Sequence, residues 1–311
     1  MSRIASWMLG ISSAGLLLLA AGCGNQTSAA PPPSKPITVV DDLGQKVTID
    51  KPATRVVTIE PSNTEIMLQL GLKKDIVGID QESFQYTPEP WKNELSGLHS
   101  IGPSYPGISE EAIVAAKPDL VLATTGIKGL SGLAAFHIPV VILNPQSIKG
   151  VYHDMLLVGT LTGHLTEAKT QVQQMQQQIS HISQKVAADT KTRPTVFYDL
   201  GDLYTAGPTS FINSLIQLAG ATNVVDKLSR QAYPEVTAEQ VVKANPDIII
   251  VDPDATTVSQ EEALPGFSAT RAVKDHEVVA LANSSYVNEP SPALVMGLKE
   301  LVRIIHPHLS L

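Results

Sequence analysis

The sequence has little cysteine and few charged residues. It contains one cysteine, Cys23, in 311 residues, so a disulfide within the chain is excluded. Charged residues make up only 17%, and the formal net charge is -8. Nucleic-acid binding needs a basic surface that neutralises phosphates, so this class is excluded. Hydrophobic residues reach 43%, which is too many for a disordered chain and enough for one or two globular domains.

Recognisable catalytic motifs are also missing. After Cys23 there is no G-x-G-x-x-G, P-loop, H-E-x-x-H or G-x-S-x-G pattern. The eight histidines are scattered, and the neighbouring carboxylates of Asp41 and Asp42 would point to opposite faces of a strand. We therefore predict no enzyme, no cofactor and no metal site. Two alternatives stay open, a hydrolase of unknown type and a metal-ion chaperone whose histidines and carboxylates converge in a cleft.

The first 36 residues read as a targeting segment. Arg3 is the only charge before Lys35, and an apolar run from Ile4 to Ala21 leads into small residues that end at Cys23. This order is typical of a secretory signal, and the end of the run resembles a bacterial lipobox, although Ala20 stands where leucine is usual. We expect a signal peptide over 1–22, lipidation of Cys23 and a flexible tether over 23–36. The alternative is a membrane anchor of minimal length.

Short apolar strands alternate with helices along the rest of the chain. A hairpin is expected over 37–49, and the first helix is expected to begin with capping by Ser62, Asn63 and Thr64, with Glu65 part of the same cap. This alternation indicates parallel α/β construction. The expected strands are 56–59, 76–79, 120–123, 140–143, 195–198, 248–251 and 278–281, and the expected helices are 61–70, 110–116, 211–218, 239–244 and 292–305.

One segment in the middle predicts a long helix. Apolar residues recur three and four apart from Leu165 to Val186, which puts one apolar stripe on about 22 residues, or about 33 Å of helix. The stripe predicts a helix that bridges two lobes, and a coiled-coil pairing surface is the alternative. We therefore expect an N-terminal lobe over 37–150, a connecting helical segment over 151–190 and a C-terminal lobe over 191–311.

An internal repeat supports the two lobes. Residues 110–122 match residues 238–250 at a constant offset of 128, and each copy has a short helix, a Pro-Asp turn and a buried strand. The hydroxyls of Ser109 and Thr237 stand where they would cap the two helices.

Several motifs in this order resemble the periplasmic-binding-protein class that serves cobalamin, ferric siderophore and haem importers. The resemblance covers the whole chain after the signal and implies two Rossmann-like α/β lobes, joined by a single long α-helix, with a ligand cleft between lobes. It also implies a monomer on the outer face of the cell membrane or in the periplasm, with an ABC permease dimer and its ATPase subunits as partners. The matching stretches are Arg55 to Glu65, Lys117-Pro118-Asp119, Tyr204-Thr205-Ala206-Gly207 and Pro234-Glu235-Val236-Thr237.

The resemblance also assigns roles to residues. Glu111 and Glu239, each seven residues before its proline in the repeat, match glutamates that meet arginines of the transporter. The alternative is that each glutamate only stabilises the first turn of its own helix through the helix dipole. Aromatic residues at the matching positions face the ligand in cobalamin-binding relatives, although each could merely pack its loop. These candidate ligand-binding residues are Tyr86, Tyr105, Tyr204, Tyr233 and Tyr286, of which Tyr86 and Tyr286 match less closely.

The expected ligand is a corrinoid such as cobalamin. Ferric siderophores are often anionic and bind sites lined by arginine and lysine, but Arg230 is the only arginine near an expected cleft loop. A ferric siderophore held by Arg230 and tyrosines is the alternative. Haem fits less well because it needs an axial ligand, and no histidine falls on the expected cleft loops.

Overall fold

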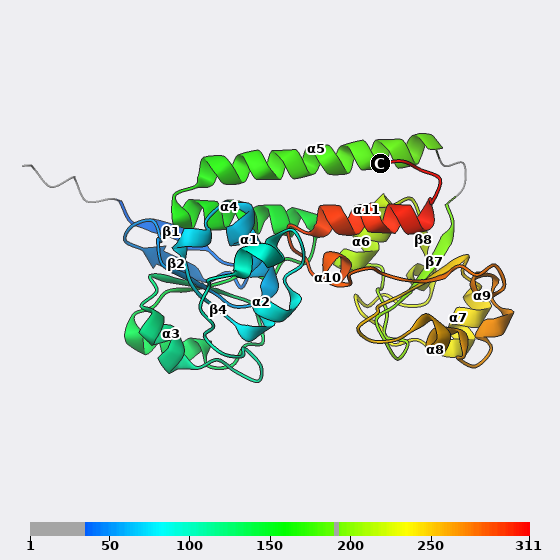
Figure 1. The fold of residues 1–311 in the computed structure, drawn as a ribbon, viewed down its shortest axis with the longest axis horizontal. Helices are drawn as coiled ribbons and strands as arrows, with labels where there is room; N and C mark the ends of the chain where they lie inside the picture. The colour runs from blue at the N-terminus through cyan, green and yellow to red at the C-terminus, as the bar shows by residue number, and fades with distance from the viewer. Residues whose placement is uncertain (1–34, 190–192) are drawn as a thin grey trace, which may run out of the picture. The chain divides into compact units, whose positions relative to one another are not determined.

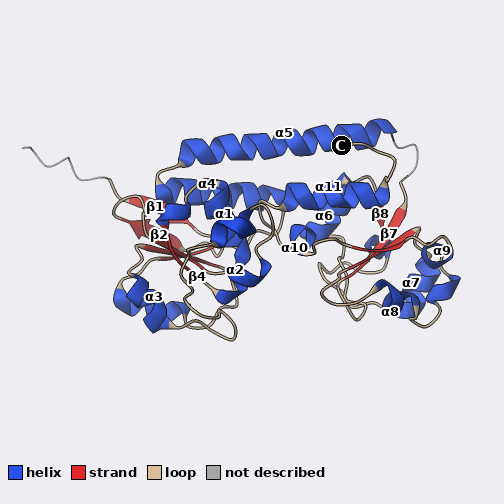
Figure 2. Ribbon diagram, viewed as in Figure 1, coloured by secondary structure: helices blue, strands red, loops and turns tan. Residues whose placement is uncertain are grey.

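The structure is a computed structural model that describes residues 35–189 and 193–311. The expected signal peptide, Cys23 and all but the end of the expected tether lie outside the described residues. The described chain has a mixed α/β fold with two parallel sheets, as Figures 1 and 2 show, and the expected fold class is confirmed. In the described part, no helix is both long and apolar enough to cross a membrane.

The N-terminal lobe contains a parallel sheet with the strand order β4-β3-β5-β6. The strands are buried apolar runs because helices cover a parallel sheet on both faces. The expected hairpin is confirmed, with Ile37 opposite Ile49. The strands are β1 (Ile37–Val40), β2 (Lys46–Ile49), β3 (Val56–Thr58), β4 (Ile76–Ile79), β5 (Leu120–Ala123) and β6 (Val140–Ile142), and the helices are α1 (Pro61–Gln69), η1 (Lys73–Asp75), α2 (Gln81–Tyr86), η2 (Trp91–Leu95), α3 (Glu110–Ala116) and η3 (Leu130–Phe136).

The C-terminal lobe contains a second parallel sheet, with the strand order β10-β9-β7-β8. Its central strands again follow the expected apolar runs. The strands are β7 (Thr195–Asp199), β8 (Thr222–Asn223), β9 (Ile248–Val251) and β10 (Val278–Ala280), and the helices are α6 (Phe211–Leu218), η4 (Val224–Lys227), α7 (Ala238–Ala244), α8 (Val258–Glu262), η5 (Phe267–Ala269), α9 (Arg271–Lys274) and α10 (Ser285–Asn288).

Three longer helices run along one side of the two sheets in Figure 1. They are α4 (Ile148–Thr162), α5 (Leu165–Asp189) and α11 (Leu294–Ile305). Gly163 ends α4 with a φ of 78°, a left-handed conformation that suits glycine, and the chain turns directly into α5. The expected long helix is confirmed. Its apolar stripe is buried in a core shared with α4 and α11, which accounts for the stripe without a coiled coil.

The repeat has the same local structure in both copies, as expected. Ser109 and Thr237 accept hydrogen bonds from backbone N–H groups in the first turns of α3 and α7. Each helix ends in a left-handed residue, and each following aspartate receives a backbone N–H at the start of a neighbouring strand. Asp119 accepts from the N–H of Arg55 at 3.0 Å, and Asp247 accepts from that of Thr195 at 2.8 Å. The Pro-Asp turn therefore ties two strands together in each lobe.

The expected capping of the first helix is wrong. The helix begins at Pro61, as expected, because the fixed φ of proline suits the first helical position, and Glu60 is the residue that precedes it. Ser62, Asn63 and Thr64 therefore lie inside the helix. Glu65 makes no capping contact and is fully buried instead.

Candidate ligand-binding site

Two adjoining cavities lie at the carboxyl ends of the N-terminal strands. Their volumes are about 350 Å³ and about 210 Å³, and both include Ser62, Thr124 and Pro290. Residues from both halves of the chain line each of them. The remaining residues are Glu60, Pro61, Glu82, Tyr86, Tyr105, Asn288 and Glu289 in the larger cavity, and Leu143, Asn144, Pro145, Gln146, Phe211 and Tyr233 in the smaller one.

The sheet topology accounts for this position. Ligands of open α/β sheets bind beyond the carboxyl ends of parallel strands. Glu60 lies just after β3, Thr124 directly after β5, and Asn144 just after β6. Polar side chains from separate parts of the sequence are thus brought to one edge of the sheet.

A hydrogen-bonded chain from the second sheet holds Asn288 in the larger cavity. The hydroxyl of Tyr198 on β7 donates to Asn288 Oδ1 at 2.5 Å. Asn288 Nδ2 donates to Asp252, directly after β9, at 2.6 Å. Both amide atoms are fixed, so this wall of the cavity is preorganised.

Glu60 adopts a backbone conformation that is rare for residues other than glycine. Its φ is 86°, and such conformations cost on the order of 1–3 kcal/mol. The Glu60 carbonyl accepts the N–H groups of Asn63 at 3.2 Å and Thr64 at 3.3 Å. Strain of this kind gathers at functional sites, and here it lies in the wall of the larger cavity.

Carboxyl groups dominate the electrostatics of the larger cavity. Burial, followed by the nearby Asp80 and Glu82, raises the pKa of Glu60 to about 7. Burial, followed by Glu65 and Glu60, raises the pKa of Glu289 well above its usual range. Although burial alone would raise the pKa of Glu82, hydrogen bonds from Ser104 lower it. At neutral pH the cavity is therefore an acceptor-rich, partly anionic surface.

No lysine, arginine or histidine of the described chain lines either cavity. An anionic ligand would meet carboxylates there without a compensating cation, and like charges repel strongly where water is excluded. A neutral ligand with many N–H donors suits the surface better.

Three of the five candidate tyrosines line the two cavities, and the other two do not. Tyr86 and Tyr105 line the larger cavity and Tyr233 the smaller one. Tyr204 is half exposed and lies near Tyr233, but lines neither cavity. The hydroxyl of Tyr286 donates to the carbonyl of Glu89 at 3.1 Å and so joins the two lobes. The ligand-contact role of all five stays a prediction.

The charged candidates lie on the surface. Arg230 is exposed and lines neither cavity. Glu111 and Glu239 are exposed in the first turns of α3 and α7, and Figure 1 shows both helices on the side of their sheets away from α5. Their equivalent placement follows from the repeat, and their docking role stays a prediction.

Sequence reasoning missed most of the acidic residues. Glu60, Asp80 and Glu82 each follow the carboxyl end of an expected strand, and that position alone could have singled them out. Glu289 gave no such signal, because it comes from the loop before the last helix.

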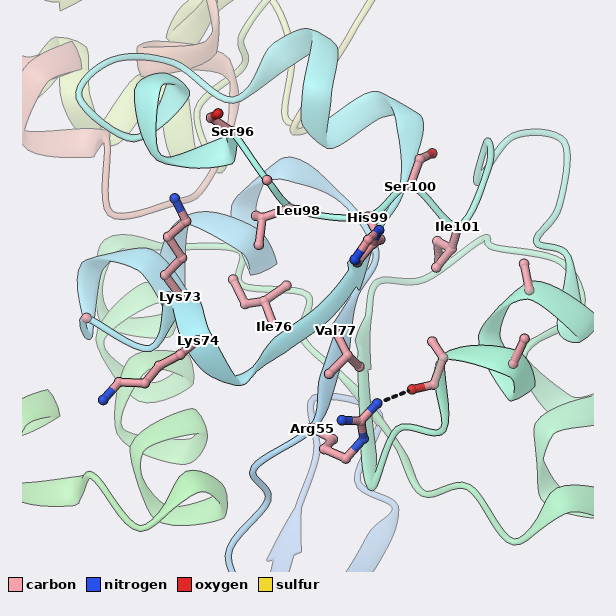
Figure 3. Close-up of a pocket in the computed structure, with 15 residues that line it drawn as sticks. Arg55, Lys73, Lys74, Ile76, Val77, Ser96, Leu98, His99, Ser100 and Ile101 are labelled. Atoms are coloured by element: carbon pink, nitrogen blue, oxygen red, sulfur yellow. Dashed lines mark hydrogen bonds between the residues drawn. The ribbon is translucent and has the colours of Figure 1, made fainter.

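A larger hollow of about 940 Å³ lies elsewhere, beside β4 and α3. Figure 3 shows Arg55 at one end of it and Lys73 and Lys74 at the other. The guanidinium of Arg55 already donates to the carbonyls of Lys117 at 2.8 Å and Ala116 at 2.6 Å. The hollow contains none of the candidate tyrosines, so it is not the expected ligand site.

Comparison with known proteins agrees with the fold. A family model described as "Periplasmic binding protein" matches residues 56–284. The chain is 30% identical to a cobalamin-binding protein of Halobacterium salinarum, over 88% of this chain and 75% of that one. It is also 30% identical to the uncharacterized ABC transporter substrate-binding lipoprotein YvrC of Bacillus subtilis, over 94% of this chain and 96% of that protein.

A similar solved structure is that of a possible iron-binding, periplasmic solute-binding protein from Staphylococcus epidermidis. It superimposes with a TM-score of 0.71 and 28% identity, over 82% of this chain and all of that one. The extent of these matches is enough to assign the family: the chain belongs to the periplasmic binding proteins.

Proposed function

We propose that this protein is the substrate-binding lipoprotein of an ABC importer and that its ligand is a corrinoid such as cobalamin. It captures the ligand between its lobes and delivers it to a permease dimer with ATPase subunits. It is a monomer held at the outer face of the cell membrane, or in the periplasm, by a lipid on Cys23. It performs no catalysis and needs no cofactor.

One observation carries the choice of ligand: the two cavities combine carboxyl groups with tyrosines and lack basic side chains among the described residues. A corrinoid offers a broad apolar ring and many primary amides, whose N–H groups are donors. Tyrosine rings supply flat apolar area, and carboxylates accept amide hydrogen bonds. Haem and ferric catecholates carry acidic groups that this surface repels. The similarity to the cobalamin-binding protein of Halobacterium salinarum and to a vitamin B12-binding protein from Yersinia pestis supports the same ligand.

Calorimetric titration tests the proposal directly. The full-length chain in mild detergent is titrated with cyanocobalamin and, in parallel, with a hydroxamate and a catecholate ferric siderophore. We expect one-to-one binding of cobalamin alone, with a Kd below the micromolar range, which corresponds to about -8 kcal/mol or better. Binding of a siderophore in place of cobalamin would overturn the corrinoid assignment and make Arg230 the next residue to replace.

Replacing Tyr233 by alanine is expected to weaken cobalamin binding by about 1–3 kcal/mol, because a large aromatic contact is lost from the smaller cavity. The same titration measures the effect. Phe136→Ala is the matched control, since Phe136 is an exposed aromatic residue that lines neither cavity. An unchanged Kd for Tyr233→Ala would remove this tyrosine from the binding site.

A further inference from the structure

Three side chains with metal-binding atoms converge outside the two cavities. They belong to Asp42, in the turn between β1 and β2, and to the neighbouring His153 and Asp154 in α4. One possible ligand atom of each lies within 4.8 Å of the others. None of the three residues lines either cavity, so ligand binding does not account for the cluster.

Asp154 is the most unusual member of the cluster. Its side chain is fully buried, with 0% exposure. No N–H group or hydroxyl of the described chain donates to either of its carboxylate oxygens, and the side chain that faces it is another carboxyl, that of Asp42. Burying a carboxylate without a partner is costly, and buried charges are normally paired or bound to metals. A cation or a hydrogen-bond donor placed next to this carboxyl group would therefore stabilise it.

The backbone holds Asp42 in place opposite Asp154. The N–H of Asp42 donates to the carbonyl of Ile142 at 3.1 Å. Its Oδ2 accepts the N–H of Asn144 at 2.6 Å, and an oxygen with one such bond still has a free lone pair. The turn is thus fixed to the end of β6, and one wall of the site is preorganised.

We propose that Asp42, His153 and Asp154 bind a divalent transition-metal ion, with zinc preferred. Two carboxylates and one imidazole form a three-residue ligand set of the kind zinc uses when a water completes the tetrahedron. Calcium and magnesium prefer oxygen ligands alone. A tetrahedral zinc ion holds its ligand atoms about 3.3 Å apart. The three atoms, which lie within 4.8 Å of one another, would therefore move closer on binding, and the exposed position of His153 leaves its side chain room to rotate.

The ion would have a structural effect, because its ligands come from two separate elements. Asp42 belongs to the hairpin that opens the described chain, whereas His153 and Asp154 belong to α4. A shared ion would tie the hairpin to the helix, and above its Kd it would stabilise the folded state by an amount that grows with the logarithm of the free metal concentration. It would not be cargo, since it lies outside the two cavities.

The test compares metal binding by the full-length chain and its variants after treatment with EDTA. Zinc is expected to bind one-to-one in calorimetry and to raise the melting temperature by several degrees, with manganese weaker and magnesium without effect. His153→Ala is expected to weaken zinc binding at least tenfold, and Asp154→Asn to abolish it. His181→Ala is the matched control, because His181 is an exposed histidine on α5.

Two results would overturn the proposal. The first is that no divalent ion changes the melting temperature or gives heat, in which case the two carboxyl groups share a proton instead. The second is zinc binding that persists unchanged in His153→Ala, because the ion would then be held elsewhere. Since His153 is exposed, its replacement is not expected to impair folding, and cobalamin titration of that variant verifies the fold.

Discussion

A chain in which both Glu111 and Glu239 are replaced by lysine is expected to lose uptake, while the Kd for its ligand stays within about twofold of the unmodified value. Both side chains are exposed and lie in equivalent first turns, so they suit a partner of approximate two-fold symmetry. Charge pairs of this kind steer encounter and fix register, and reversing the charge turns attraction into repulsion. Uptake in a strain that depends on this importer and calorimetry on the purified chain measure the two quantities.

The control reverses two other exposed glutamates, Glu167 and Glu277, and should leave uptake intact. If Glu111 and Glu239 served only their helix dipoles, the lysine variant would keep uptake and lose about 0.3–1 kcal/mol of stability for each helix. A collapse of ligand affinity in the lysine variant would also contradict the docking role.

Glu65→Gln is expected to raise the melting temperature by roughly 5 °C or more at pH 8.5 and by little at pH 5. Burial raises the pKa of Glu65 to about 8, although Ser291 and the backbone at Ala293 oppose that effect. The folded state therefore keeps a proton that the unfolded state releases above the ordinary pKa of about 4.5. Stability is lost as the pH rises from about 4.5 to about 8, by an amount on the order of 5 kcal/mol, and glutamine avoids this loss.

Thermal melting in EDTA at the two pH values measures this effect. Other buried carboxyl groups also make the parent chain less stable at high pH, so the difference between parent and variant isolates Glu65. Glu167→Gln, at an exposed position, should leave the melting temperature almost unchanged at both pH values. An equal stabilisation by Glu65→Gln at pH 5 and pH 8.5 would show that the carboxyl of Glu65 does not titrate in this range.

Most helices and strands of the fold could be predicted from the sequence. The strand β9 and the helix α6 have the expected bounds, because buried strands are continuous apolar runs and helix ends carry local caps and stops. The capping of α1 was misjudged because Ser62, Asn63 and Thr64 are common capping residues, but a helix that begins at Pro61 contains them in its first turn. The fixed φ of proline suits that first position.

Long-range contacts set the limit of the site prediction. Tyr86, Tyr105 and Tyr233 line the cavities, and their sequence positions were informative through the family resemblance. The burial of Glu65 depends on packing against a segment more than 200 residues away. The approach of Asp42 to Asp154 depends on how the hairpin packs on α4. Neither contact has a periodic or local signal.

The apolar stripe of α5 also constrains how a transporter could recognise the ligand-bound form of the protein. A single apolar cluster contains residues of both sheets together with those of α4, α5 and α11. Separating or rotating the lobes would expose part of that cluster to water, at a cost proportional to the area uncovered. Large lobe motions would therefore be costly, and the distance between α3 and α7, the helices that carry Glu111 and Glu239, would change little on ligand binding. A transporter that grips both would distinguish the loaded from the empty protein by the surface around the cavity mouth.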